Sequence, residues 1–316
     1  MSIRSYLREI GRGKDGARSL AREQAADLMG QVLDAQVSDL ELGAFCIAMR
    51  VKGESVAEML GFLDAVRSRS QLVPASQQPL VVLPSYNGAR RLPLLTPLVA
   101  ELLARAGARV LVHHHASEDQ RLPIASVAGQ LGWNESKTIA NIEDGSLAIA
   151  HLGLICPGLS RLLDVRRSLG LRNSGHSLVK LFNPCAGAAL VVGSYTHPEY
   201  AQVMADVFCQ SQTPALLLRG TEGEPVADAR RVPAMQAIAD GRLWTVQDAQ
   251  SGTLEAARPG EGDALPLGLD AAGTAALIRD MLEGRRTVPA PIALQVEHIL
   301  RLLKTNPVNL SKHCPS

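Results

Sequence analysis

Arginine and lysine side chains are the groups in this sequence whose spacing most readily suggests chemistry. Their densest clusters are candidate contacts for phosphate: Arg12, Lys14, Arg90, Arg91, Arg166, Arg167, Arg172 and Lys180. A guanidinium group offers a planar fork of donors that fits a phosphate or a carboxylate, and an ammonium group is a compact point charge. Each cluster is therefore either an anion-binding site or a solvated, charged part of the surface.

The net charge of +1 conceals basic and acidic territories along the chain. Residues 1–22 hold six basic and two acidic side chains, or +4, and residues 160–180 hold five basic and one acidic, again +4. Residues 222–284 hold eleven acidic side chains and five arginines, or −6. This asymmetry permits an anionic partner, such as nucleic acid, without identifying one.

Two groups of residues have side chains that bind metals in other proteins. Glu222 and Glu224 follow the apolar run 215–218, and carboxylates in such a loop either hold Mg²⁺ or lie in solvent. The run 113–115 contains three histidines, but adjacent residues of a strand point to opposite faces, so their imidazoles cannot converge on one ion. We interpret the histidines as polar residues at a strand end. We predict no metal, with Glu222 and Glu224 as weak candidates.

The segment 11–16 is spelled G-x-G-x-x-G, which resembles a dinucleotide-binding fingerprint. Such a fingerprint must follow a strand, whereas residues 5–10 have the pattern of an amphipathic helix. We therefore interpret the segment as a turn between two helices.

Composition excludes several classes of protein. Aromatic residues are scarce (four Phe, four Tyr and two Trp), so an extended base-stacking platform is not expected. The five cysteines are scattered and form no C-x-x-C pair, which favours buried thiols over a zinc site or a disulfide framework. No apolar run approaches the roughly 18 residues of a membrane helix. We expect a cytoplasmic protein with no membrane partner.

The hydrophobic pattern of the sequence changes near residue 80. Residues 19–69 show helical periodicity, with capping-box spacing at Ser38/Glu41 and at Ser55/Glu58. From residue 80, short apolar runs alternate with helical patterns, which favours a mostly parallel sheet flanked by helices. The predicted strands are 80–83, 110–113, 152–155, 189–193, 215–218 and 243–246. We predict an α/β protein with a helical domain at 1–70, a linker at 71–79 and a larger α/β domain at 80–316. Ligands of such sheets bind beyond the carboxyl ends of the strands.

Residues 20–62, with the segments 37–39 and 48–54, resemble the helical N-terminal domain of anthranilate phosphoribosyltransferase. The segments 166–184 and 220–223 are also similar to those of that family. The resemblance implies a small helical bundle, a larger α/β domain of the anthranilate phosphoribosyltransferase and nucleoside phosphorylase type, and a homodimer formed through the helical parts. It also implies that the chain returns to the helical domain near 160–185.

Departures from the enzymes concern the donor site. Their Gly-Thr-Gly-Gly-Asp loop for phosphoribosyl pyrophosphate is replaced by residues 85–89, and their Lys-His-Gly-Asn-Arg segment by residues 113–117. Side chains at Tyr86 and Asn87 would fill the space in which glycine lets backbone N–H groups approach phosphate. Arg166 and Arg172 match positions that contact substrates in the enzymes. We interpret the following residues as a vestigial ligand loop: Ser85, Tyr86, Asn87 and Gly88.

The segments 84–90, 11–14 and 197–200 resemble the YbiB-like branch, described as binding nucleic acid with little sequence preference and as lacking the biosynthetic activity. We therefore expect a homodimer whose basic grooves bind single- or double-stranded DNA or RNA, with no cofactor and no catalytic residues. Tyr86 either stacks on a base or packs inside the protein. Two alternatives stay open: a Mg²⁺-dependent phosphoribosyltransferase with an altered acceptor or donor, and a ribose-phosphate sensor using Arg166 and Arg172.

Overall fold

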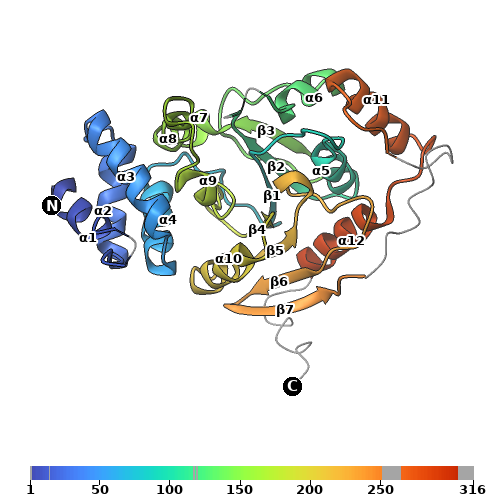
Figure 1. Cartoon of the computed structure of the whole chain (residues 1–316). Helices are drawn as coiled ribbons and strands as arrows, with labels where there is room; N and C mark the ends of the chain where they lie inside the picture. Colours follow the sequence, from blue (N-terminus) through green and yellow to red (C-terminus); the bar gives the residue numbers. More distant parts are fainter. Residues whose placement is uncertain (1, 14, 117, 119, 251–264, 305–316) are drawn as a thin grey trace.

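The computed structural model describes residues 2–13, 15–116, 118, 120–250 and 265–304. A helical bundle lies at one end of the molecule, beside an α/β domain (Figure 1). Four helices form the bundle: α1 (Ile3–Ile10), α2 (Arg22–Leu33), α3 (Asp39–Lys52) and α4 (Val56–Ser68). Both predicted capping boxes are confirmed. The Ser38 side chain caps α3 with Glu41 in return, and Ser55 and Glu58 do the same for α4.

The α/β domain is built on a seven-stranded sheet of order β3-β2-β1-β4-β5-β6-β7. The first five strands in this order are parallel, and β6 and β7 are antiparallel. Their bounds are β1 (Leu80–Ser85), β2 (Arg109–His114), β3 (Leu147–His151), β4 (Ala189–Tyr195), β5 (Ala215–Arg219), β6 (Met235–Ala239) and β7 (Arg242–Gln247). The prediction of a mostly parallel sheet is confirmed.

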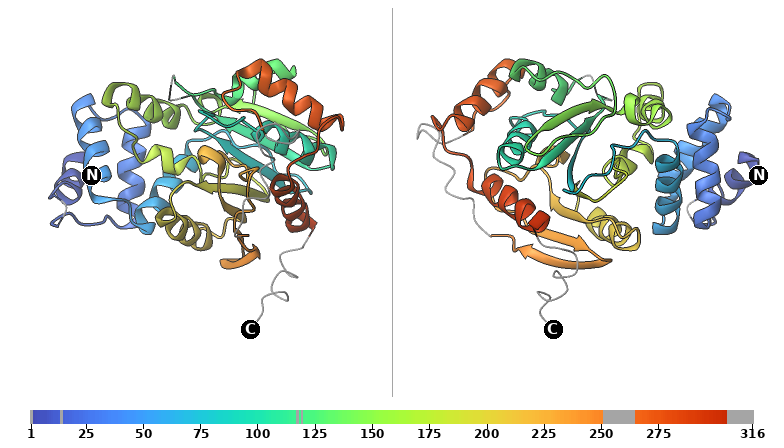
Figure 2. Two further views of the ribbon diagram at one scale, coloured as in Figure 1. Left: turned by 45° about the vertical axis from the view of Figure 1, so that its right-hand side comes forward. Right: turned by 180° about the vertical axis from the view of Figure 1, so that it is seen from behind.

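Helices cover both faces of the sheet (Figures 1 and 2). The helical segments of this domain are α5 (Thr96–Arg105), α6 (Ile124–Leu131), α7 (Leu152–Ile155), α8 (Pro157–Leu169), α9 (Gly175–Leu178), α10 (Glu199–Gln210), the 3-10 turn η1 (Thr221–Gly223), α11 (Ala271–Leu282) and α12 (Ala290–Lys304). Alternate residues of β1 belong to different cores: Val82 packs with the bundle, α8 and α10, and Val81 with α5, α11 and α12.

One predicted strand is wrong. Residues 152–155 form the short helix α7, and the strand is the segment immediately before it, β3. A short apolar run is compatible with either a buried strand or a buried helix, so periodicity alone could not distinguish them.

The segment that follows β3 packs against the helical bundle. The Arg161 guanidinium group on α8 donates to the carbonyl oxygens of Val32 and Leu33 on α2, at 3.1 and 2.7 Å. A Cβ atom at Gly158 would lie 2.4 Å from the Leu33 oxygen, so glycine permits this close approach.

Among the described residues, no helix combines the length and the apolar character that a membrane span requires.

Candidate anion-binding site

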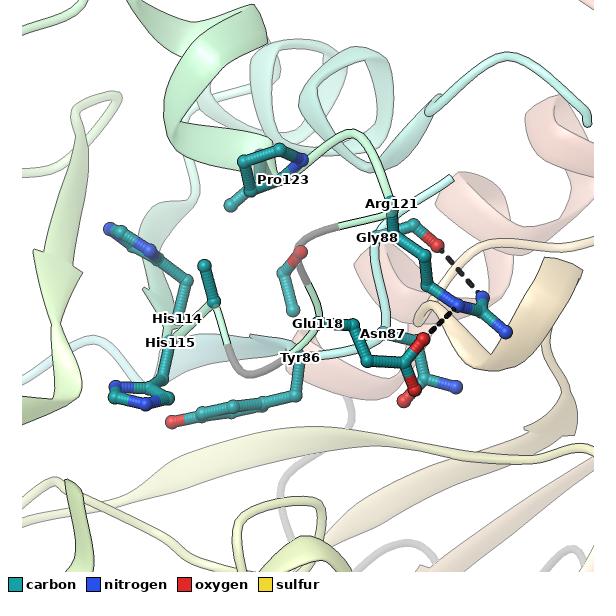
Figure 3. A pocket seen from close by; sticks show the side chains of 11 residues that line it. Tyr86, Asn87, Gly88, His114, His115, Glu118, Arg121 and Pro123 are labelled. Atoms are coloured by element: carbon teal, nitrogen blue, oxygen red, sulfur yellow. Dashed lines mark hydrogen bonds and ion pairs between the residues drawn. The ribbon is translucent and has the colours of Figure 1, made fainter. Parts of the chain in front are cut away.

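Three connections meet at the carboxyl edge of the parallel strands: the loop 85–91 after β1, the loop 115–121 after β2 and the turn 220–224 after β5. The first two of these connections line a pocket (Figure 3). This is the edge at which parallel α/β sheets bind ligands.

The carboxylate of Glu224 fills the centre of the loop after β1. Its Oε1 atom accepts hydrogen bonds from the backbone N–H groups of Asn87 and Gly88, both at 2.8 Å. Its Oε2 atom accepts from the hydroxyl groups of Ser85, at 2.5 Å, and Thr96, at 2.9 Å. Glu224 is 1% exposed. The backbone donors that such a loop would offer to a phosphate are therefore used by a carboxylate of the chain itself.

Glu222 extends this arrangement. Its carboxylate accepts from the backbone N–H groups of Arg90, at 2.5 Å, and Arg91, at 3.1 Å. Between the two glutamates, Gly223 has φ +89°, and a Cβ atom there would lie 1.9 Å from the Asn87 side-chain nitrogen. Only glycine fits this contact. The turn 220–224 and the loop after β1 are thus interlocked.

The pocket lined by the loops after β1 and β2 is too small for a phosphoribosyl pyrophosphate. The space open to the centre of a water molecule is about 10 Å³, which is roughly that of one water. Mg²⁺ also requires several oxygen ligands in near-octahedral geometry, whereas both oxygens of Glu224 are held by hydrogen-bond donors. The residues present do not fit the magnesium and pyrophosphate that the resemblance to anthranilate phosphoribosyltransferase implies.

Tyr86 packs inside the protein. Its hydroxyl group lies 2.5 Å from His113 Nδ1, and the two rings meet edge to face with centroids 5.3 Å apart. Burial raises the pKa of Tyr86 and lowers the pKa of His113 to about 3, so both groups are neutral near pH 7. The sequence left two interpretations of Tyr86, stacking on a base or packing inside the protein. The structure supports packing, because the ring is buried and is not available to a base.

The three adjacent histidines lie at the end of β2, as the sequence predicts, and all three are buried. They have different partners: His113 contacts Tyr86, and His114 Nε2 lies 3.2 Å from Glu135. His115 Nδ1 and Nε2 lie 3.1 and 3.0 Å from Ser160 and Asp164 on α8. In the part of the chain that the structure describes, no three His, Cys, Asp or Glu residues are arranged to hold a metal ion.

Three arginines converge on Glu118, and we call these four residues the Glu118 cluster. Arg121 Nε lies 2.7 Å from the carboxylate, Arg172 Nη2 lies 3.1 Å from it, and Arg166 is its third ion-pair partner. Burial favours the neutral acid, but hydrogen bonds from Arg166 and Arg172 prevail and lower the pKa of Glu118 to about 2. With three cations and one anion, the cluster carries a net charge of +2.

The cluster also affects a neighbouring histidine. Burial, together with the charges of Arg172 and Arg166, lowers the pKa of His176 to about 3. Sequence analysis identified Arg166 and Arg172 but missed Arg121 and Glu118. Arg121 lies in the loop after β2, as Arg90 lies in the loop after β1, so its position beyond a predicted strand was the available signal.

The other predicted arginines near this edge have exposed side chains. Arg90 and Arg91 have exposed side chains on the loop after β1. The exposed Arg167 on α8 donates to the Ala116 carbonyl oxygen at 2.7 Å and lies 3.4 Å from Asp164. These three arginines and the Glu118 cluster lie on the connections that follow β1 and β2, on α8 and on the turn after α8.

Two predicted residues lie elsewhere, and one is outside the described chain. The Lys180 ammonium group donates to the carbonyl oxygens of Gly223, at 2.9 Å, and Ser194, at 3.3 Å, and burial lowers its pKa to about 8. It therefore braces the turn 220–224 from inside. Arg12 follows α1, where it pairs with Glu9 in the bundle, at the end of the molecule away from the sheet (Figure 1). Lys14 lies outside the described residues.

A helical bundle beside a mostly parallel sheet, with the candidate site at the sheet's carboxyl edge, is the architecture of a glycosyltransferase scaffold. Residues 4–70 match the helical bundle domain of a glycosyl transferase family. The whole fold is similar to anthranilate phosphoribosyltransferase from Thermus thermophilus, with a TM-score of 0.68 and 21% identity over 91% of this chain and 84% of that one. The Saccharomyces cerevisiae enzyme in complex with PRPP and Mg gives a TM-score of 0.67 and 13% identity, covering 95% and 88%.

Sequence similarity is more specific. YbiB of Escherichia coli strain K12 is 37% identical over 306 residues, which cover 94% of this chain and 92% of YbiB. Anthranilate phosphoribosyltransferase of Thermobifida fusca is 24% identical over 299 residues, which cover 92% and 83%. The chain belongs to the anthranilate phosphoribosyltransferase-like superfamily, within the family of YbiB.

Proposed function

We propose that the protein binds single- or double-stranded nucleic acid without sequence preference, through phosphate contacts at the carboxyl edge of its sheet. The observation that carries this proposal is the convergence of Arg121, Arg166 and Arg172 on one carboxylate, which gives these four residues a net charge of +2. The exposed Arg90 and Arg91 extend the basic surface from the neighbouring loop. Phosphate neutralisation by such groups is the main source of sequence-independent affinity.

The chemistry of the edge supports recognition of the backbone and not of the bases. Base stacking needs exposed aromatic rings, and the aromatic residue in the loop, Tyr86, is used inside the protein. Arginine forks fit phosphate oxygens regardless of sequence. Binding is therefore electrostatic and strongly dependent on salt.

The transferase alternative is disfavoured by Glu224. A transferase must hold pyrophosphate and stabilise its developing charge. Here the donors of the loop at Ser85, Asn87 and Gly88 bind the Glu224 carboxylate, and the pocket has room for about one water. We therefore propose a transferase-like scaffold that has arginines at the carboxyl edge of the sheet. In its loop after β1, the Glu224 carboxylate occupies the donors that would bind pyrophosphate.

A homodimer formed through the helical bundle belongs to the same proposal. On α3, the side chains of Leu40, Ile47 and Val51 are exposed, and a hollow beside them is lined by residues of α1 and α3. Exposed apolar side chains grouped on one helix are typical of a protein interface. A second copy on this face would join two basic edges into one particle. Sedimentation of the wild type and of Val51→Asp tests this, because the variant is expected to be monomeric.

The binding proposal is tested with two labelled single-stranded oligonucleotides of unrelated sequence and one duplex, titrated with protein at about 50 mM salt. We expect comparable affinities for the two single strands. A parallel assay mixes the protein with anthranilate, phosphoribosyl pyrophosphate and Mg²⁺, and no consumption of anthranilate is expected. Turnover without oligonucleotide binding would support the transferase alternative and reject the proposal.

A further inference from the structure

We propose that Glu118 holds the place of a nucleic-acid phosphate, and that a phosphate group of the bound strand displaces its carboxylate from Arg121, Arg166 and Arg172. This inference rests on the proposed function and adds an internal competitor to it. The affinity for the strand then depends on a difference between two interaction energies. The phosphate gains its contacts with the three arginines, and the arginines lose their contacts with the Glu118 carboxylate.

The arrangement of the three arginines matches a single tetrahedral anion. They come from two elements, the loop after β2 and the end of α8 with its following turn, yet all three contact one carboxylate. The Arg172 backbone is held from the helical bundle, because its carbonyl oxygen accepts from Arg50 of α3 at 3.2 Å. A carboxylate and a phosphodiester present similar anionic oxygens to a guanidinium fork, so one can replace the other.

The Glu118 carboxylate is accessible to a competitor. Its side chain is 21% exposed, and those of Arg121, Arg166 and Arg172 are 20, 20 and 36% exposed. Glu224 provides the contrast, because it is 1% exposed and held by four uncharged donors inside the protein. An incoming anion can therefore exchange with Glu118 but not with Glu224.

The charge balance favours exchange. The Glu118 cluster remains at +2 while the carboxylate is bound, and it becomes +3 toward an incoming phosphate once the carboxylate has left. Burial, together with the charges of Arg172 and Arg166, lowers the pKa of the neighbouring His176 and keeps it neutral, so it adds no further charge to the site. The surplus attracts a polyanion to the site, and the carboxylate keeps the three arginines positioned before it arrives.

The test compares Glu118→Gln with Glu297→Gln. Both variants raise the net charge by one, but Glu297 lies on α12 and pairs with Arg301 away from the basic edge. For a labelled single strand at about 50 mM salt, Glu118→Gln is expected to bind about five- to tenfold more tightly than wild type. Its salt slope should be steeper by about 0.7, the value for one further net positive charge facing the phosphates of the strand. Glu297→Gln should match wild type in both quantities.

A double-mutant comparison shows whether the tighter binding of Glu118→Gln arises at the Glu118 cluster. Arg166→Ala should weaken binding more in the Glu118→Gln background than in the wild type, because the arginine then has no internal partner. Inorganic phosphate and pyrophosphate are the competing probes: if they bind Glu118→Gln and the oligonucleotide does not, the site takes a small phosphate and the inference is wrong. If wild type binds the strand and Glu118→Gln binds it equally, only this inference fails. If neither binds, the proposed function fails too.

Discussion

The Glu224 carboxylate accepts a hydrogen bond from the backbone N–H group of Gly88 at 2.8 Å, across 136 residues of sequence. The loop after β1 has therefore kept the geometry with which backbone donors surround an anion. The anion itself belongs to the turn after β5. Under the proposed function, this relationship accounts for a glycosyltransferase-like fold whose loop after β1 holds a carboxylate of the chain in place of a phosphoribosyl donor.

Replacing Glu224 with alanine should destabilise the protein. Four donors would lose their acceptor in a buried place, and each unsatisfied donor costs roughly 1–3 kcal/mol. We expect the free energy of unfolding, measured by urea denaturation, to fall by about 3 kcal/mol or more. A variant as stable as wild type would show that the carboxylate does not organise the loop.

The same variant should be rescued by small anions. Glu224→Ala leaves a cavity that is lined by N–H and O–H donors, so formate or phosphate should bind there and raise the melting temperature by mass action. Wild type, whose cradle is filled, should respond much less. Equal responses of the two proteins would mean that the anions act elsewhere.

Acid should destabilise the protein through His113. An imidazole has an ordinary pKa of 6.5, and burial lowers that of His113 to about 3, so the unfolded chain binds a proton that the folded protein excludes. The stability contributed by neutral His113 is complete above about pH 6.5 and declines as the pH falls toward 3. Near pH 5, His113→Gln should reduce the slope of stability against pH by about 1.4 kcal/mol per unit.

Tyr86→Phe is the matched control for the histidine. It removes the hydrogen bond to His113 but keeps the titrating imidazole, so stability should fall while most of the pH slope remains. Urea denaturation of the three proteins between pH 4.5 and 6.5, within the range bracketed by the two pKa values, separates the effects. If the slope of stability against pH were unchanged in His113→Gln, the uptake of a proton by His113 on unfolding would be excluded.

Removing the arginines of the loop after β1 should weaken binding of nucleic acid. Arg90→Ala/Arg91→Ala removes two exposed cations, and the salt slope for a single strand should decrease by about 1.4 if both contact phosphate. Arg285→Ala/Arg301→Ala removes the same charge near α11 and α12 and serves as the control. If affinity and slope stay at wild-type values, these two residues do not line the binding surface.

Restoring glycine in the loop should not restore a transferase. Tyr86→Gly/Ala89→Gly removes side chains from the loop, but Glu224 still occupies the backbone donors. We expect no phosphoribosyl transfer to anthranilate. The assay monitors anthranilate fluorescence, which decreases when anthranilate is consumed. Measurable product would show that the closed loop is not what prevents the reaction.

Features with local causes could be predicted from the sequence. The capping boxes at Ser38 and Ser55 depend on side chains three residues apart, and the parallel sheet follows from alternating apolar runs and helices. The helix at 152–155 was mistaken for a strand because four apolar residues have no resolvable period.

The centre of the site depends on contacts between distant segments. From the sequence, Glu224 is either a weak candidate for a metal ligand or a solvated loop charge. Its buried position against Asn87 could not be predicted, because it arises from the neighbouring strands β1, β4 and β5. The role of Glu118 likewise requires α8 to fold over the loop after β2. Charge in the sequence indicated where anions could bind, but only packing determines which arginines share one carboxylate.

The central claim is that phosphate groups bind at the arginine-rich edge of the sheet. Its most direct test is the salt dependence of affinity for one labelled single strand, measured by fluorescence anisotropy between about 50 and 200 mM salt. The account predicts tight binding at low salt and a linear loss of log affinity with log salt, with a slope corresponding to several phosphates. Absence of binding at about 50 mM salt, or an affinity that salt does not change, would contradict it.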